Sequence, residues 1–349
     1  MIYRLLPVLL LSGCATPSER IATVVPSEAG LSHQSAAEED ARLIDFLDAA
    51  FDAQAALSPE TLTSLGSRQD YDKLGDYTLG AGDEELQLAE RQLAQLRAGF
   101  NPARLGPSAQ LSYALFEREV ERRRESNRFH AYDLPVSTNG TPAGSIPVFL
   151  INQHKVESAS DARAYIARLK ESERVMRETV AVMRQQAALG IVPPEMVFAP
   201  AVADARRILQ GAPLTDGDDN PVWTDFQAKV NALAIPSEEK TGLLTDGRAA
   251  LTGPFRTGVK ALIAGIQQVE PQADGNNGAW SLPDGEAYYA HRLATYTTTD
   301  LTADQIHGIG LEQVAAIRAE MEAVMREIGF TGTLENFFTV LRSDEAYKY

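Results

Sequence analysis

Residues 160–189, SDARAYIARLKESERVMRETVAVMRQQAAL, predict one long helix and with it the class of the fold. Apolar side chains recur at three- and four-residue spacing, as on the buried face of an amphipathic helix. They are Tyr165, Ile166, Leu169, Met176, Val180 and Met183. Gly190 follows as a C-terminal stop. At 1.5 Å per residue the helix is about 45 Å long, which suits the backbone of a large helical body.

Helical periodicity continues on both sides of this stretch, so we predict a mainly α fold, a multi-helix body with long helices. Further helices are expected over 38–56, 83–98, 108–127, 193–209, 224–233 and 237–269, the last split by Gly253-Pro254. Ser58-Pro59-Glu60 and the capping box Thr302-Ala-Asp-Gln305 each open a helix. The segment 146–151 reads as a short strand or an extended segment.

The helix after Thr302 is expected to bury a regular core stripe. Its members are Ile306, Gly310, Val314, Ile317, Met321, Val324 and Ile328.

The N-terminus predicts export and a lipid anchor. Arg4, the apolar run 5–11 and the sequence Leu11-Ser12-Gly13-Cys14 form a signal peptide over residues 1–13. Leu-Ser-Gly-Cys resembles the bacterial lipobox, in which the cysteine is acylated; the alternative is that Cys14 is the single thiol of a soluble protein. Ala15 follows the cysteine, and by resemblance to Gram-negative lipoproteins this favours the outer membrane, with the body facing the periplasm.

Composition is that of a folded envelope protein. Hydrophobic residues make up 44% and charged residues 23%, enough for a core, and residues 14–35 read as a flexible tether before a helical body over 36–349. With Arg4 removed, 31 basic and 48 acidic residues leave a charge of −17. Such a surface repels phosphate backbones, so nucleic acid is not an expected partner.

Charged and metal-ligating residues give no clear site. None of the five histidines is followed by Glu, so the His-Glu-x-x-His element is absent, and no serine-hydrolase elbow or phosphate loop occurs. Asp304 and His307 share a helix face, but two ligands do not make a metal site. The acidic loop 211–221 lacks the calcium-binding pattern. The basic run 122–124 is better explained as a solvated helix end than as a binding patch.

Three segments carry a family resemblance: WSLPDGEAYY at 280–289, YTTTDLT at 296–302 and IHGIGLE at 306–312. They resemble the bacterial family called domain of unknown function 885, whose members are often exported lipoproteins and look like helical zincin metallopeptidases. The resemblance covers most of the chain after about Arg42 and corresponds to the N-terminal half of the family. It implies that zinc is held in full-length members by a His-Glu pair and a Pro-Gly-His-His element, neither of which occurs here. No metal ligand and no catalytic residue are therefore assigned.

Residues of the best-matched segment are candidates for the wall of a substrate cleft that would take a peptide: Asp284, Gly285, Tyr288, Tyr289 and His291. Polar aromatics can line such a cleft, though they can equally close a core with the hydroxyl at its rim.

Three functions remain open. The chain is a catalytically incomplete part of a metallopeptidase-like lipoprotein, a non-enzymatic binding or scaffold module, or an intact hydrolase that uses residues outside known motifs. The first, which we prefer, predicts an exposed apolar patch over 306–328 or 334–341.

Overall fold

The computed structural model describes residues 36–275 and 278–345 and confirms the mainly α class. The predicted leader, Cys14 and the tether lie outside the described residues. Within the described ranges the only β pairing is two isolated bridges, Ser137–Gly140 and Ala212–Asp219. None of the helices there combines the length and the apolar character that a bilayer span requires.

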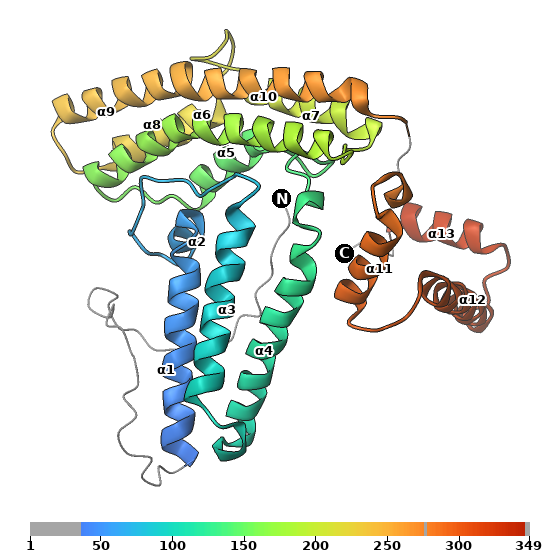
Figure 1. Cartoon of the computed structure of the whole chain (residues 1–349). Coiled ribbons are helices and arrows are strands. Elements are labelled where there is room, and N and C mark those ends of the chain that lie inside the picture. Colours follow the sequence, from blue (N-terminus) through green and yellow to red (C-terminus); the bar gives the residue numbers. More distant parts are fainter. Residues whose placement is uncertain (1–35, 276–277, 346–349) are drawn as a thin grey trace. The chain divides into compact units, whose positions relative to one another are not determined.

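The helices follow one another as shown in Figure 1. They are α1 (Ala36–Ala55), α2 (Pro59–Ser64), α3 (Ala81–Gly99), α4 (Pro107–Asn127), α5 (Pro142–Asn152), α6 (Ala159–Ala188), α7 (Glu195–Ile208), α8 (Pro221–Ala232), α9 (Ser237–Ala250), α10 (Arg256–Val269), α11 (Gly285–Thr297), α12 (Ala303–Glu327) and α13 (Leu334–Ser343). The chain divides into two compact units, Met1–Pro283 (unit 1) and Asp284–Tyr349 (unit 2), each described by itself.

Unit 1 has two hydrophobic cores. In the smaller core, α1, α3 and α4 form a bundle around Leu43, Leu93, Leu96 and Tyr113 (Figure 1). Leu111, on the same helix as Tyr113, is 61% exposed because it lies on the opposite face of α4. The larger core is built from α5 to α10.

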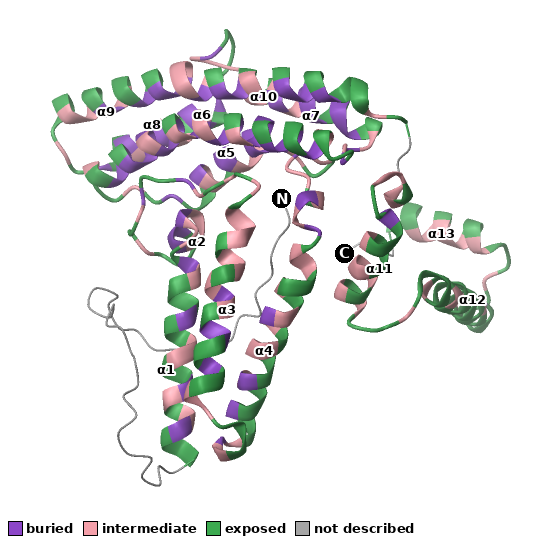
Figure 2. Cartoon of the chain, viewed as in Figure 1, coloured by how far each residue is buried: buried purple, intermediate pink, exposed green. Residues whose placement is uncertain are grey.

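The long helix predicted at 160–189 is α6, and its predicted stripe from Tyr165 to Met183 is buried (Figure 2). Ser158 caps its first turn, and Gly190 ends it with a φ of +76°. Helix α10 packs closely along α6 because glycine lies at the contact. A Cβ atom on Gly265 would stand 2.4 Å from Cγ2 of Val180, well inside van der Waals contact.

One local prediction is wrong. Residues 146–151 belong to α5, which begins at Pro142 and buries Ile146, Pro147 and Leu150 at helical spacing. Proline at the first position favours the start of a helix, and Lys229 of α8 donates hydrogen bonds to the carbonyls of Leu150 and Ile151 near its end.

The split predicted at Gly253-Pro254 is confirmed, because α9 ends at Ala250 and α10 begins at Arg256. A π-helical segment, Leu251–Phe255, joins α9 directly to α10. The wider π turn keeps the chain helical through Pro254, although proline has no N–H to donate.

Unit 2 buries very few of its described residues. The predicted capping box at Thr302 and Gln305 opens α12, but the stripe predicted as its core is not buried: Val314 is 66% exposed and Val324 is 49% exposed. Figure 2 shows α12 almost entirely in the colour of exposed residues. The exposed apolar patch predicted over 306–328 is therefore confirmed, and the assignment of these residues to a core is wrong.

Candidate functional site

A cavity of about 250 Å³ lies in unit 1 among α2, α3, α5 and the loop between α2 and α3. Its polar side combines the hydroxyls of Ser58, Tyr77 and Ser145 with four carboxylates, which are Glu60, Asp76, Glu84 and Glu85. Its apolar side comes from Leu57, Ile146 and Phe149. The lining holds no Lys, Arg or His, so the cavity favours neutral or cationic groups with an apolar part over anions.

Glu60 connects the cavity to the loop that forms one of its walls. Its carboxylate accepts hydrogen bonds from the backbone N–H of Gly75 at 3.0 and 3.1 Å and from the hydroxyl of Tyr77 at 3.2 Å. Burial, together with the charge and hydrogen bond of Glu60, raises the pKa of Tyr77 far above its ordinary value. Tyr77 is therefore a fixed donor toward Glu60 rather than an acid that titrates near neutrality.

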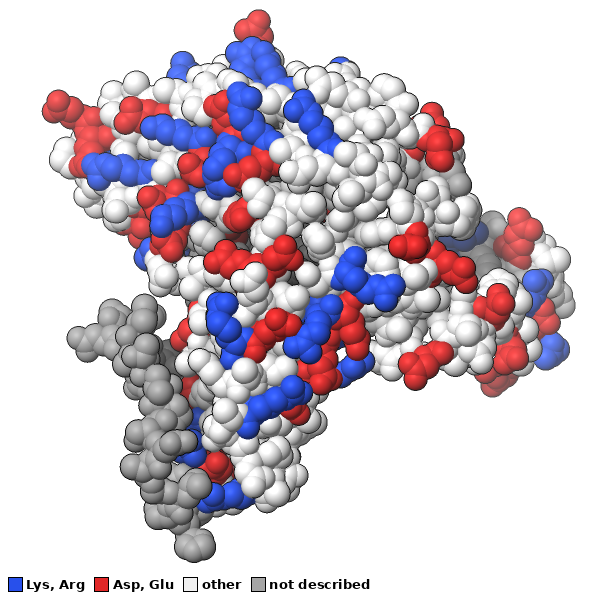
Figure 3. All heavy atoms as spheres, in the orientation of Figure 1, with Lys and Arg blue, Asp and Glu red and all other residues white. Residues whose placement is uncertain are grey.

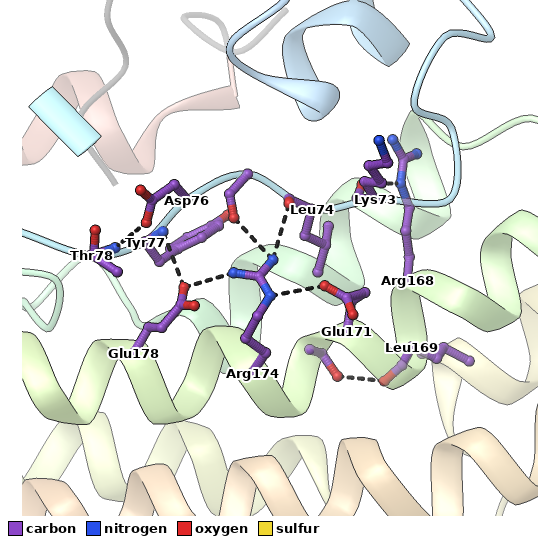
Figure 4. A network of polar contacts seen from close by, with 12 residues as sticks. Lys73, Leu74, Asp76, Tyr77, Thr78, Arg168, Leu169, Glu171, Arg174 and Glu178 are labelled. Atoms are coloured by element: carbon purple, nitrogen blue, oxygen red, sulfur yellow. Dashed lines mark hydrogen bonds and ion pairs between the residues drawn. The ribbon is translucent and has the colours of Figure 1, made fainter. Parts of the chain in front are cut away.

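Arg174 of α6 holds the same loop from the other side (Figure 4). It pairs with Glu171 at 2.9 Å and Glu178 at 2.7 Å, and it donates to the carbonyls of Leu74 and Gly75 at 3.0 and 3.1 Å. Burial alone would lower its pKa, but the hydrogen bonds that Arg174 donates to the carboxylates of Glu178 and Glu171 outweigh burial and raise it. Arg174 thus remains charged and keeps the cavity wall against α6.

Arg168, one turn and a half earlier on α6, is fully buried yet contacts no carboxylate in its described hydrogen bonds. It donates to the carbonyl of Lys73 at 2.8 Å (Figure 4), the carbonyl of Pro59 at 3.2 Å and the hydroxyl of Thr63 at 2.7 Å. Burial lowers the pKa of Arg168 to about 10, so it is still cationic at neutral pH. Main-chain oxygens of α2 and its following loop therefore solvate this charge.

His154 completes this network as a neutral side chain. Its Nδ1 lies 2.9 Å from Nη1 of Arg168, and its Nε2 lies 3.0 Å from the carbonyl oxygen of Asp161. Arginine can only donate, so Nδ1 accepts and Nε2 carries the proton. Burial first, and the charge of Arg168 further, lower the pKa of His154 to about 3. A ring held in this way has a structural role and is not available as a metal ligand.

The residues predicted for a substrate cleft all lie in unit 2 and do not line this cavity. Asp284 precedes α11 with a φ of +49°, Gly285 is buried, and Tyr289 is 48% exposed. Tyr288 and His291 are spaced three residues apart on the same helix. Their place in a cleft stays a prediction.

The other motifs have plain structural explanations. The basic run at the end of α4 is paired internally, Arg122 and Arg123 with Glu119, and Arg124 with Glu90 of α3. Figure 3 shows the same intermixing of basic and acidic side chains over the visible face of the molecule. Asp304 and His307 are both exposed in the first turns of α12.

Sequence reasoning missed the cavity and the buried Arg168. The Ser58 cap was predicted, and the hydroxyl of Ser58 does accept from the N–H of Thr61, but the contacts of Glu60 beyond it depend on long-range packing. Zinc can be tested against the side chains that are present. Among residues 36–275 and 278–345, no three His, Cys, Asp or Glu side chains gather closely enough to hold a metal ion. The described residues do not fit a zinc site, and no catalytic step is assigned to one.

Comparison with solved structures gives the fold. The crystal structure titled "putative lipoprotein from Colwellia psychrerythraea" superposes with a TM-score of 0.75 at 18% identity, over 90% of this chain and 55% of that protein. The chain thus spans about half the length of that relative. No curated protein sequence matches the chain. Residues 59–349 match the family described as bacterial protein of unknown function, DUF885. Since that match covers well over half of the sequence, the chain belongs to the DUF885 family.

Proposed function

We propose that this chain is an exported lipoprotein, held in the cell envelope by acyl groups on Cys14, with its helical body facing the periplasm from the outer membrane. We further propose that the body is the part of a metallopeptidase-like fold that does not bind metal, and that it is catalytically incomplete by itself. The observation that carries this proposal is the match to a considerably longer protein, in which 90% of this chain corresponds to 55% of that one.

Three further observations support the proposal. The sequence Leu11-Ser12-Gly13-Cys14 has the form of a lipoprotein cleavage and acylation site, and the Colwellia protein carries the description of a lipoprotein. The exposed apolar side chains of α12 are those of a helix that normally packs against further protein.

The anchor is tested by expressing the chain in bacteria fed with labelled palmitate. We expect label and membrane association for the native chain and for Ser12→Ala, which keeps a small residue near the cleavage site. Cys14→Ser should lose both, because the serine hydroxyl does not replace the thiol that is acylated. An unlabelled native chain that fractionates with soluble protein contradicts the anchor.

Catalytic incompleteness is tested with the purified chain. We expect less than stoichiometric zinc after dialysis and no hydrolysis of a mixed peptide library above the level without enzyme. One zinc ion per chain, together with peptide cleavage that a chelator abolishes, would instead support an intact hydrolase and overturn the proposal.

A further inference from the structure

The middle of α12 presents an apolar stripe to solvent. Every residue from 311 to 320 is exposed. For comparison, α4 of unit 1 exposes two leucines one turn apart, Leu111 at 61% and Leu115 at 54%, and not a longer row. On α12 the exposed fractions are 66% for Val314, 47% for Ile317 and 49% for Val324. Scattered apolar side chains are ordinary on a surface, whereas a continuous row marks a contact with another protein element.

The spacing of this row identifies the kind of element that fits it. Gly310, Val314, Ile317, Met321, Val324 and Ile328 alternate at intervals of four and three residues. That is the a and d pattern of a seam into which a neighbouring helix inserts its own side chains. We call these six positions the α12 seam. Its natural occupant is an amphipathic helix.

Unit 2 does not supply that helix. Among residues 284–345, the buried positions are Gly285 and Met325. Met325 lies near the end of α12, where the chain turns back. The N–H of Phe330 donates to the Met325 carbonyl, and the rings of Phe330 and Phe337 pack edge to face with centres 5.1 Å apart. The contact with α13 therefore reaches the last turn of α12 and leaves Val314 and Ile317 without cover from this unit.

The comparison with the Colwellia protein indicates where the occupant comes from. That protein shares this fold over 55% of its length, which leaves about 45% outside the match. We propose that the α12 seam is the docking surface for an amphipathic helix from that remaining part of the fold. This inference rests on the proposed function, since it takes the helical body to be one part of a larger fold.

The negative charge of α12 indicates which charged side chains the occupant should carry. Helix α12 carries five acidic and two basic side chains, and Glu320 and Glu327 border the seam on one side at a spacing of seven residues. An occupant with Lys or Arg beside its apolar stripe complements this helix. Two copies of α12 would instead bring together helices with the same excess of negative charge, which disfavours a second copy as the occupant.

The test uses the mature chain with Cys14→Ser and, as the probe, a polypeptide made of the part of the Colwellia protein outside the match. The two are co-expressed and the affinity of the purified components is measured by titration calorimetry. We expect a one-to-one complex, and a Kd that rises at least about tenfold with Ile317→Glu or Val324→Glu, because each places a charge in the centre of an apolar contact. Leu111→Glu, at a leucine of unit 1 that is 61% exposed, should leave the Kd unchanged.

Four outcomes overturn the inference. The first is no complex with the native chain, and the second is a complex whose Kd is the same with Ile317→Glu. The third is a dimer of the chain alone that Ile317→Glu dissociates, because the occupant would then be a second copy. The fourth is a monomer in which Ile317→Cys resists a thiol reagent while Leu111→Cys reacts, because the chain would then cover its own seam. The assay involves neither acylation of Cys14 nor zinc, so its failure is distinct from a failure of the proposed function.

Discussion

His154 makes the stability of unit 1 sensitive to acid. The hydrogen bonds of its two ring nitrogens determine which substitution removes this sensitivity. The ring is 1% exposed, accepts from Arg168 and donates to the carbonyl of Asp161. Protonation of Nδ1 would break the first of these bonds and place two cations 2.9 Å apart. The amide of a glutamine can accept and donate in the same two directions but does not titrate, so His154→Gln isolates the contribution of the proton.

The size of the effect follows from the two pKa values of the group. In the unfolded chain the pKa of a histidine is about 6.5, and in the folded protein burial and Arg168 lower the pKa of His154 to about 3. Between these values the unfolded chain binds more protons than the folded protein, so stability is fully present above pH 6.5 and is lost as the pH falls toward 3. Between pH 7 and pH 4.5 the loss amounts to about 2.5 kcal/mol, an order-of-magnitude value.

Urea unfolding at the two pH values measures this loss. Trp223 is buried in the larger core, and replacing the 78% exposed Trp280 by Phe makes it the single tryptophan reporter. We expect the unfolding free energy of the His154 protein to fall by about 2.5 kcal/mol more than that of His154→Gln over this pH range. The variant is itself weakened at pH 7, because it loses the ring contact with Tyr71 at 4.1 Å, so the comparison rests on the pH dependence alone. His307→Gln on the exposed part of α12 is the control. Equal losses for the native chain and His154→Gln would refute the reasoning.

Three further substitutions test the packing of unit 1, each by urea unfolding at pH 7. Arg168→Met should cost at least about 3 kcal/mol, because it leaves several buried oxygens without a donor; a loss under about 1 kcal/mol would show that water replaces the guanidinium. Gly265→Val should cost about 1–3 kcal/mol by forcing α10 away from Val180, whereas Gly242→Ala, where a Cβ meets nothing within 4 Å, should be neutral or slightly stabilising. Thr141→Val should be neutral or stabilise by up to about 1–2 kcal/mol, because the buried Thr141 hydroxyl has no hydrogen-bond partner among the described residues; a clear loss of stability would mean that the hydroxyl is bound by water.

The features that were predicted correctly from the sequence depend on residues that lie close together in the chain. The stripe of α6, the cap at Ser58, the glycine stop at 190 and the capping box at Thr302 each involve residues within a few positions of one another. Residues 146–151 form a helix, although Val, Phe and Ile favour strands, because Ile146, Pro147 and Leu150 share one buried helical face.

Features that depend on distant residues could not be predicted in the same way. Arg168 is one of several arginines on α6. The carbonyl oxygens to which it donates lie 95 and 109 positions away in the sequence. The cavity likewise combines α2, α3 and α5. The α12 seam shows a different limit: periodicity predicts which face of a helix is apolar, but it does not identify what covers that face.

The arginines of α6 have a consequence for how the cavity wall can vary among relatives. Arg168 and Arg174 hold the loop after α2 through the main-chain carbonyls of Lys73, Leu74 and Gly75. A carbonyl oxygen is present whatever side chain a residue carries, so point substitutions in this loop leave the anchorage intact. An inserted or deleted residue is different, because it moves every following carbonyl away from its guanidinium. The loop should therefore tolerate amino-acid substitutions but not changes in its length. The side chains that line the cavity can then change during evolution while the main chain of its wall keeps its position.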